Sequence, residues 1–456
     1  STLTAETSSI QGTQNQLTVA SYKVLNLDPL LEVQSRTSGN QARNVDDDIA
    51  DGRFAAIAAQ IVNNLNSPDI IGLQEIQDNT GGEIVDTIIS ADVTLQTLIT
   101  AISNAGGPTY AFIDNTFITD LASGGQPGGN IRTAYLYNPN RVDLLENSIA
   151  TIGGQGSGEA FEGARLPLVA SFEFNGEVIT VINNHFSSKG GSAPIFGLEQ
   201  PFESRQEEVT VNGSLDERQR QSDAVQTFVS NGLAENANAN IIVLGDLNEF
   251  EFVSPVLELE TDAGLNNLTN TLAEDERYSF IFQGNSQSLD HILVSDNLNS
   301  IASFDIVHVN SEFEDTDMRA SDHDPLLAGF NISGETPSTE VVLSPIQDAF
   351  IQGTQGINDN LIRVENGNRV GYLQFSLLGI LGEVTAARLE MTQTADPGNG
   401  TIQVSFGGND DWTEFNLDSD NAPDADVFFD AVSGSFDNGQ TFSWDLDVAT
   451  LFDDDG

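Results

Sequence analysis

Residues 17–332 alternate between short apolar segments and longer segments whose apolar residues recur at helical spacing. Segments such as PDIIGLQEI (68–76) and ANIIVLGDLNEF (239–250) are almost continuously apolar, which is typical of strands buried on both faces. The helical segments between such strands include 53–66, 94–105 and 215–233. This order predicts an α/β fold in which helices cover sheets.

The chain changes character at SGETPSTE (333–340). Beyond it, short segments such as TIQVSF and TFSWDLDV alternate polar and apolar residues, and turns rich in Gly, Asn and Asp separate them. Alternating strands without a helical period are typical of a β-sandwich. We therefore predict a linker at 1–16, an α/β catalytic domain at 17–332, a linker at 333–340 and an all-β sandwich domain at 341–456.

The charge balance restricts the surroundings in which the chain can work. Against 69 Asp and Glu stand 14 Arg and 2 Lys, giving a formal net charge of −53. Such a surface repels polyanions at low salt, and about 1 M salt shortens the Debye length to roughly 3 Å. We expect a saline environment.

The absence of Cys excludes disulfides, thiolate metal sites and Cys nucleophiles. No apolar run approaches the roughly 18 residues of a transmembrane segment, and a start at Ser1 without Met predicts a processed product.

Several predicted strands end in residues that can bind metal or move protons, and others follow directly after such residues. Polar residues at one set of strand ends converge on one crevice of an α/β sheet. Carboxylates gathered there suit a hard cation such as Mg²⁺, Mn²⁺ or Ca²⁺, and neighbouring histidines can act as general acid and base. The residues at these positions are Glu75, His185, Asp246, Asn248, Asp290, Asp322 and His323.

Each of these signals has an ordinary structural interpretation when taken alone. The LQE motif can be a surface pair, GDLN a turn and SDH a capping or Asx turn, while His185 can be a hydrogen-bonded structural histidine. The order and spacing of all the motifs together are far more specific. Two other histidines, His291 and His308, lie on apolar strands and are predicted to be structural.

The series VASYKVLNLDP, PDIIGLQEIQD, RTAYLYNPNRV, ARLPLVASF, NNHFSSKGG, VLGDLNEF, SLDHILVS and SDHDPLLAGF resembles the endonuclease/exonuclease/phosphatase superfamily over about residues 17–332. Within it, the chain is most similar to large bacterial extracellular nucleases related to pancreatic-type deoxyribonuclease. The resemblance implies a four-layer α/β sandwich, in which two packed mixed sheets are flanked by helices. It also implies secretion or a bacterial cell-surface location.

The resemblance assigns catalytic roles to residues that match the motifs. Asp246 and Asn248 match the pair that orients the attacking water or a second metal and holds the scissile phosphate. His323 matches the histidine that handles the proton of the water, and Asp290 the carboxylate that orients that histidine. His185 matches the second catalytic histidine, which protonates the leaving oxygen or stabilises the phosphorane.

The resemblance also assigns residues that bind metal and phosphate. Glu75 and Asp322 match the ligands of a divalent metal, Mg²⁺ or Mn²⁺. Arg165 matches an arginine beside the phosphate, and Arg132 and Lys189 are further phosphate contacts. Phosphodiester hydrolysis needs an activated water, a neutralised equatorial charge and a stabilised leaving group, and this set supplies all three.

The sequence departs from the family at Lys23, where the first motif usually has Asn. The lysine could contact the phosphate directly, displace or weaken a metal, or point away while Asn26 compensates. A second open question concerns Arg218 and Gln221 in the segment 215–233. They could line a substrate groove or pair with some of the many acidic side chains.

The segment 341–456 resembles, more weakly, the β-sandwich DNRLRE-type modules of secreted bacterial proteins, which are similar to carbohydrate-binding modules. That resemblance implies attachment to a polysaccharide or cell surface and would allow a structural Ca²⁺. The alternative is a spacer that binds no ligand.

The leading functional hypothesis is a secreted, metal-dependent endonuclease of low specificity whose substrate is extracellular DNA, or RNA. Affinity for nucleic acid comes largely from Lys and Arg contacts to phosphate, which are scarce here. One alternative therefore keeps the chemistry and changes the substrate, as in a sphingomyelinase-type phospholipase or a small-phosphoester phosphatase. The other is a non-catalytic matrix or adhesion protein, with Lys23 as a sign of a lost activity.

Overall fold

The computed structural model describes residues 3–37, 45–126, 128–193, 205–314, 319–333, 340–378, 380 and 384–451. The chain forms two compact units, Ser1–Thr336 and Pro337–Gly456. Most of the predicted linker at 333–340 lies outside the described residues. The described residues of the predicted linker at 1–16 belong to the first unit and pack on the rest of it. Ser8 N donates to Asn64 O at 2.9 Å, and the Ile10 side chain is buried.

The first unit contains two six-stranded mixed sheets. The strands of the first sheet, in spatial order, are β13 (Ala302–Ile306), β14 (Leu326–Asn331), β1 (Gln16–Leu27), β2 (Ile70–Ile76), β4 (Arg132–Tyr137) and β3 (Ala111–Asp114). The strands of the second sheet are β5 (Asp143–Leu144), β6 (Leu168–Phe174), β7 (Glu177–His185), β8 (Asn240–Asp246), β12 (Asp290–Val294) and β9 (Asn266–Asn267). A separate hairpin pairs β10 (Phe280–Phe282) with β11 (Asn285–Gln287).

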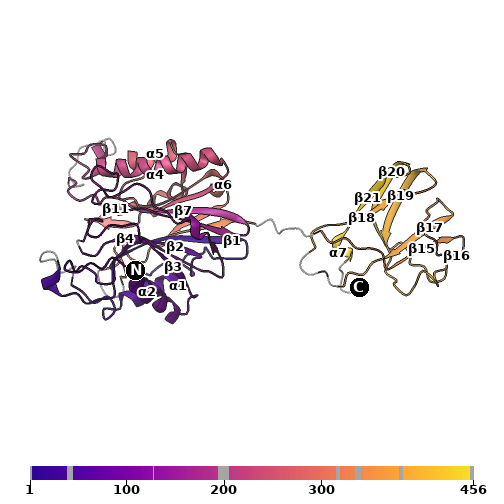
Figure 1. The fold of residues 1–456 in the computed structure, drawn as a ribbon, viewed down its shortest axis with the longest axis horizontal. Helices are drawn as coiled ribbons and strands as arrows, with labels where there is room; N and C mark the ends of the chain where they lie inside the picture. Colours follow the sequence, from indigo (N-terminus) through magenta and orange to yellow (C-terminus); the bar gives the residue numbers. More distant parts are fainter. Residues whose placement is uncertain are drawn as a thin grey trace. The chain divides into compact units, whose positions relative to one another are not determined.

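Helices cover the outer faces of both sheets (Figure 1). The helices described in this unit include α1 (Arg53–Asn63), α2 (Asp92–Asn104), α4 (Leu215–Glu235), α5 (Ser254–Thr261) and α6 (Asp296–Asn299). One buried cluster joins α1 and α2 to the first sheet, a second fills the space between the sheets, and a third joins α4 and α5 to the second sheet. This confirms the predicted four-layer α/β arrangement.

The interior between the sheets is mainly apolar, and polar side chains bridge it in places. Gly72 of β2 lies where the sheets approach closely, because a Cβ there would meet Leu244 Cδ1 at 2.4 Å. Beside it, Asn183 of β7 accepts a hydrogen bond from Gln74 Nε2 at 2.7 Å and donates to Leu73 O and Ala134 O of the first sheet. Buried amides that are fully hydrogen-bonded fix the alignment of the strands that carry them.

The described part of the second unit consists of small β-sheets and one short helix. Its strands are β15 (Gln347–Gln352), β16 (Gln355–Ile357), β17 (Arg369–Gln374), β18 (Ala387–Thr392), β19 (Gly398–Phe406), β20 (Val427–Phe436) and β21 (Thr441–Leu446), followed by α7 (Val448–Leu451). They form three sheets, β16–β15–β17, β18–β21 and β19–β20. The predicted β-rich character of this region is confirmed.

Candidate functional site

The predicted site residues lie at one edge of the sheet pair because of strand direction. β1 is parallel to β2, and β7 is parallel to β8, so each pair ends at the same edge. β12 is antiparallel to β8 and begins at that edge, where Asp290 lies opposite Asp246 and Asp246 lies beside His185. His323 lies three residues before the start of β14, which is antiparallel to β1 and therefore also begins there.

A bulge in β2 sets the direction of Glu75. The register of β2 shifts between Leu73 and Ile76 relative to β4, and Glu75 has a φ of 62°. A left-handed conformation is costly for a residue with a Cβ, and such strain collects at functional sites. The extra residue breaks the alternation of the strand. Gln74 thus bonds to Asn183 in the interior, while Glu75 reaches Lys23 and His185 at the edge.

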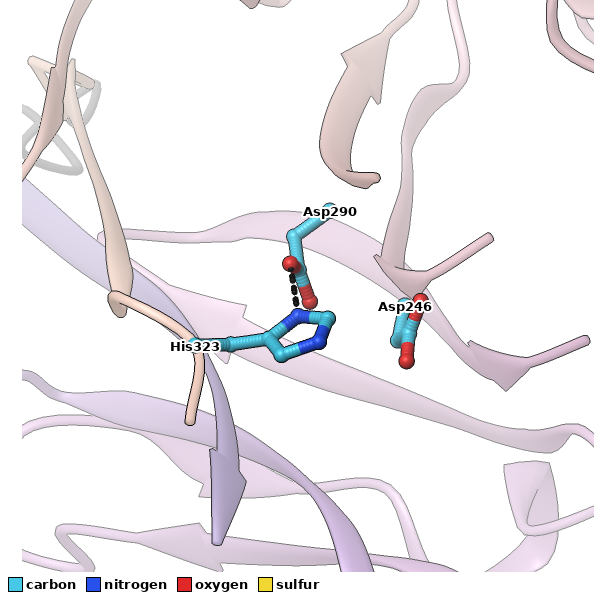
Figure 2. A group of neighbouring side chains, drawn as sticks. All are labelled: Asp246, Asp290 and His323. Carbon is cyan, nitrogen blue, oxygen red and sulfur yellow. Dashed lines mark hydrogen bonds and ion pairs between the residues drawn. The ribbon is translucent and has the colours of Figure 1, made fainter. Parts of the chain in front are cut away.

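The centre of the site is a buried His323–Asp290 pair. The His323 ring lies between Asp290 and Asp246, with its Nδ1 toward Asp290 and its other nitrogen on the Asp246 side (Figure 2). Nδ1 lies 2.6 Å from Asp290 Oδ2, which also accepts a hydrogen bond from Ser279 Oγ at 2.6 Å. The Phe280 ring stacks on the imidazole, with centroids 4.5 Å apart. Pairing Nδ1 with a carboxylate leaves Nε2 as the nitrogen that can exchange a proton.

The charge of Asp290 controls the protonation of His323. Burial by itself would lower the pKa of His323, but the charge of Asp290 and its hydrogen bond raise this pKa from the usual 6.5 to about 9. Burial and the charge of Asp290 also raise the pKa of Asp246 to about 7. His323 is therefore a cation at neutral pH and becomes a base only in alkaline solution.

This raised pKa predicts a pH dependence of stability. The protonated His323 ring stabilises the fold fully below its unfolded pKa near 6.5, and that contribution is lost as the pH rises through about 9. We expect the difference in free energy of unfolding between wild type and Asp290→Asn to shrink between these values, as measured by urea denaturation at pH 6, 7.5 and 9. A constant difference would contradict the assignment. The comparison cancels the titration of groups that Asp290 does not influence, and Asp246, whose pKa Asp290 also raises, contributes a change of the same sign.

His185 lies at the end of β7 and faces two carboxylates. Its Nε2 is 3.5 Å from Asp246 Oδ2 and 3.8 Å from Glu75 Oε1, distances longer than a hydrogen bond. Burial and the positive charges of Arg165, Lys23 and His323 hold the pKa of His185 well below its usual value. His185 is thus a neutral imidazole. A neutral ring is a poor acid but can still donate a hydrogen bond.

Asn248 and Arg165 both contact the segment that follows His185. Asn248 N donates to Asp246 Oδ1 at 2.9 Å, and its Nδ2 donates to Phe186 O at 3.1 Å. Arg165 is buried and donates from Nη2 to the same carbonyl. Burial lowers the pKa of Arg165, and the charges of Glu75 and Asp246 oppose that effect. The Arg165 guanidinium therefore lies in the electrostatic field of the site carboxylates, where a phosphate would bind.

Lys23, the residue that departs from the family pattern, lies between the two predicted metal ligands. Its Nζ is 2.7 Å from Asp322 Oδ1 and 3.3 Å from Glu75 Oε1. The Lys23 side chain is only 6 % exposed. Burial alone would lower the pKa of Lys23, but the charges of Asp322 and Glu75 raise it, and the ammonium in turn lowers the pKa of Asp322. Of the three interpretations of Lys23, the one in which it points away is wrong.

Glu75 and Asp322 therefore do not fit a divalent ion as they stand. Oxygen ligands bind such ions at about 2.0–2.6 Å, and the Lys23 ammonium already occupies the space between these carboxylates. A different group, Asp246, Asp290 and His323, has ligand atoms within 4.8 Å of one another and could bind one ion. Among the described residues, Asp28, Glu32 and Asp46 form a further acidic group of this kind. There, burial and the charge of Glu32 raise the pKa of Asp28 to about 9.

Other basic residues predicted to contact phosphate have carboxylate partners. Arg132 is fully buried and its Nη1 lies 2.9 Å from Asp114 Oδ1. Lys189 Nζ lies 2.5 Å from Glu249 Oε1 and 4.5 Å from the centre of the Phe250 ring. Both remain predictions as phosphate contacts, and both would have to share or exchange these partners to bind a substrate.

The structure also decides between the two interpretations of Arg218 and Gln221, which lie in α4. Arg218 is fully buried and bonds to Glu249 Oε2 through Nε at 3.0 Å and Nη2 at 2.9 Å. Gln221 bonds to the backbone and hydroxyl of Ser187. Both side chains hold the loop after β7 and pair with buried partners, so they do not form the wall of an open groove.

Sequence reasoning missed Ser279 and Phe280, which hold Asp290 and His323 in place. Both lie in YSFIFQGNSQSLDHI, so their nearness to Asp290 could have drawn attention to them. His291 and His308 lie outside the cluster, as parts of other hydrogen-bond networks. His291 bonds to Asn267 Nδ2 and Glu249 O, and His308 Nδ1 lies 3.0 Å from Asp324 Oδ2.

Comparison with known proteins found several solved structures that are similar to part of this chain. Solved structures with a similar fold include truncated TDP2 from Caenorhabditis elegans, with 18% identity, a TM-score of 0.43 and coverage of 69% of this chain and 98% of that one. The human Nocturnin catalytic domain has 16% identity, a TM-score of 0.42 and coverage of 70% and 95%. An endonuclease/exonuclease/phosphatase family protein from Bacteroides thetaiotaomicron has 17% identity, a TM-score of 0.42 and coverage of 72% of this chain and 98% of that one.

No curated protein matches the chain. Among the described residues, no helix has the length and apolar character needed to cross a membrane. The model of the endonuclease/exonuclease/phosphatase family matches residues 39–323, which is more than half of the sequence. The chain therefore belongs to the endonuclease/exonuclease/phosphatase family, which includes nucleases, phosphodiesterases and phosphatases.

Proposed function

We propose that this chain is a phosphodiester hydrolase that cleaves DNA, and RNA where it is accessible, with little sequence preference. The observation that supports this best is the His323–Asp290 pair facing Asp246, with a second, neutral histidine, His185, whose Nε2 lies 3.5 Å from Asp246 Oδ2. A paired imidazole and an unpaired one beside the same carboxylate suit a reaction that activates water and stabilises charge on phosphorus.

Unpartnered buried atoms indicate where the substrate would bind. Within the described residues, Arg165 Nε, His185 Nδ1 and Glu75 Oε2 are buried without a hydrogen-bond partner. Buried polar atoms are rarely left unpaired, so such atoms point to a ligand or a water. We propose that Arg165 and His185 donate to phosphoryl oxygens, and that Glu75 accepts from a bound water.

The proposed reaction then follows from these positions. The neutral His323 ring accepts a proton from water at Nε2 while the oxygen of the water attacks phosphorus. Asp290 holds Nδ1 and stabilises the imidazolium that forms. The bond from phosphorus to the leaving oxygen breaks, that oxygen takes a proton from solvent, and the positive charge of Arg165 lowers the energy of the five-coordinate state.

Cleavage of supercoiled plasmid by the purified chain tests this proposal. We expect nicking by the wild type and a loss of about 10²–10³-fold in rate in His185→Ala, because a preorganised donor to the phosphorane is removed. Reactions should include Mg²⁺, Mn²⁺ and EDTA, at low NaCl and near 1 M NaCl. Raising salt should speed cleavage of plasmid, since it screens the repulsion of a chain with net charge −53 from DNA. Equal nicking by wild type and mutant would show that the activity does not arise from this site.

One observation favours a second candidate, a hydrolase of small phosphodiesters. Lys23, Arg132, Lys189 and Arg218 are all paired with carboxylates, which reduces the positive charge available to a polyanion. Bis(p-nitrophenyl) phosphate is a suitable comparison substrate. Its hydrolysis without any plasmid nicking, lost in His185→Ala, would replace the nuclease by this candidate. No hydrolysis of either substrate would favour the non-catalytic alternative.

A further inference from the structure

We infer that the Lys23 ammonium is a built-in cation that takes the place of a divalent metal between Glu75 and Asp322. The inference deepens the proposed function, and its catalytic meaning rests on that proposal. The geometry carries it, because Nζ lies 2.7 Å from Asp322 Oδ1 and 3.3 Å from Glu75 Oε1. These are the two carboxylates that the family resemblance assigns to metal.

The protein holds Lys23 firmly in this position. The residue lies inside β1, where it pairs with Gln74 of β2, and the adjacent Ser321 hydroxyl donates to the Lys23 carbonyl at 2.5 Å. Only 6 % of the side chain is exposed, so most of it is shielded from solvent. Withdrawing a buried ammonium from its carboxylates would leave charges of both signs uncompensated, which is strongly unfavourable.

A divalent ion cannot simply join this group. It would need oxygens at about 2.0–2.6 Å, in space that Nζ occupies, and it would be repelled by the positive charge there. The chain also lacks the neutral amide oxygen that the family pattern places at this position. The replacement of an oxygen donor by a cation converts a metal site into an ion pair with the same two carboxylates.

The ammonium still offers positive charge to a substrate. An ammonium has three N–H donors; Lys23 donates one to Asp322 Oδ1 and forms an ion pair with Glu75 at 3.3 Å. An N–H of Lys23 that these carboxylates do not use can contact a phosphoryl oxygen close to Arg165. The charge of the same Glu75 also acts on the Arg165 guanidinium. Lys23 would thus supply fixed positive charge to the phosphate, but it cannot change the acidity of a bound water as a metal does.

Mn²⁺ binding, counted by isothermal titration calorimetry and electron paramagnetic resonance near 1 M NaCl, tests the inference. High salt weakens diffuse binding to the acidic surface, and the same background sites occur in every variant. The set is wild type, Glu75→Gln, Lys23→Asn and the double variant. We expect wild type and Glu75→Gln to bind equal numbers of ions, Lys23→Asn to bind one more, and the double variant to lose it again.

Two results would overturn the inference. The first is a wild-type protein that loses one Mn²⁺ on Glu75→Gln, since Glu75 would then already bind metal. The second is a folded Lys23→Asn that gains no ion. Should Lys23→Asn fail to fold, the wild type and Glu75→Gln still decide. The readout is binding, so a protein that cleaves no substrate would disprove the proposed function and leave this result standing.

Discussion

Replacing His323 by glutamine is expected to lower kcat for phosphodiester hydrolysis by about 10²–10⁴-fold, the usual contribution of a positioned general base. Glutamine keeps the approximate length of the side chain and removes the nitrogen that accepts a proton. The reaction should be followed with bis(p-nitrophenyl) phosphate as well as plasmid, so that weak DNA binding does not obscure the chemical step. The wild-type rate should rise with pH until the ring loses its proton near pH 9.

Asp290→Asn separates the role of the base from that of its partner. Loss of the carboxylate removes the charge that raises the pKa of His323, so the pH-rate profile should move to lower pH and its plateau should fall. His308→Gln is the matched control, because His308 is also a buried histidine that pairs through Nδ1 with an aspartate, Asp324. It should keep the wild-type rate per folded molecule. Equal losses in His323→Gln and His308→Gln would indicate general destabilisation.

The largest expected effect on stability comes from Arg218→Gln. The side chains of Arg218 and Glu249 are both fully buried, so removal of the guanidinium takes both of its hydrogen bonds from Glu249 Oε2 and leaves Lys189 as the cation paired with this carboxylate. Breaking such a pair typically costs about 3–5 kcal/mol. Arg218 also donates to the carbonyls of Ser187 and Ser188, which follow β7, and those bonds would be lost too.

Arg220→Gln is the control for this change, since it makes the same substitution on the same helix. Arg220 pairs with Asp216 on the surface, where the two side chains are 52 % and 66 % exposed. Exposed pairs contribute about 0–1 kcal/mol, so its free energy of unfolding should hardly change. Urea denaturation at neutral pH measures both. Equal costs for the two variants would mean that Glu249 does not depend on Arg218.

The site could be predicted largely from strand ends, since direction and hydrophobic pattern determine which edge of a sheet each residue reaches. Asp246 and His185 follow apolar strands, and the structure brings them together with Glu75 and His323. The choice of partners could not be predicted. Among 69 acidic residues, no local pattern indicates that Arg218 pairs with Glu249.

Lys23 shows why the contacts within the site could not be predicted from local sequence patterns. Its partner Asp322 lies on a distant part of the chain, and three interpretations of the lysine were equally consistent with the sequence. The direction of Glu75 depends on a backbone φ of 62° within a strand that otherwise reads as regular. Neither a long-range ion pair nor one left-handed residue leaves a periodic trace in the sequence.

The position of β1 has a consequence for synthesis of the protein. β1 lies between β2 and β14, and its first residue, Gln16, pairs with Asn331. A nascent chain that ends at residue 300 therefore has one side of β1 unpaired and lacks both Asp322 and His323. The ribosome must release almost the whole first unit before these two residues can join Glu75, His185 and Asp246. A protein with this topology therefore has an incomplete site for most of its synthesis.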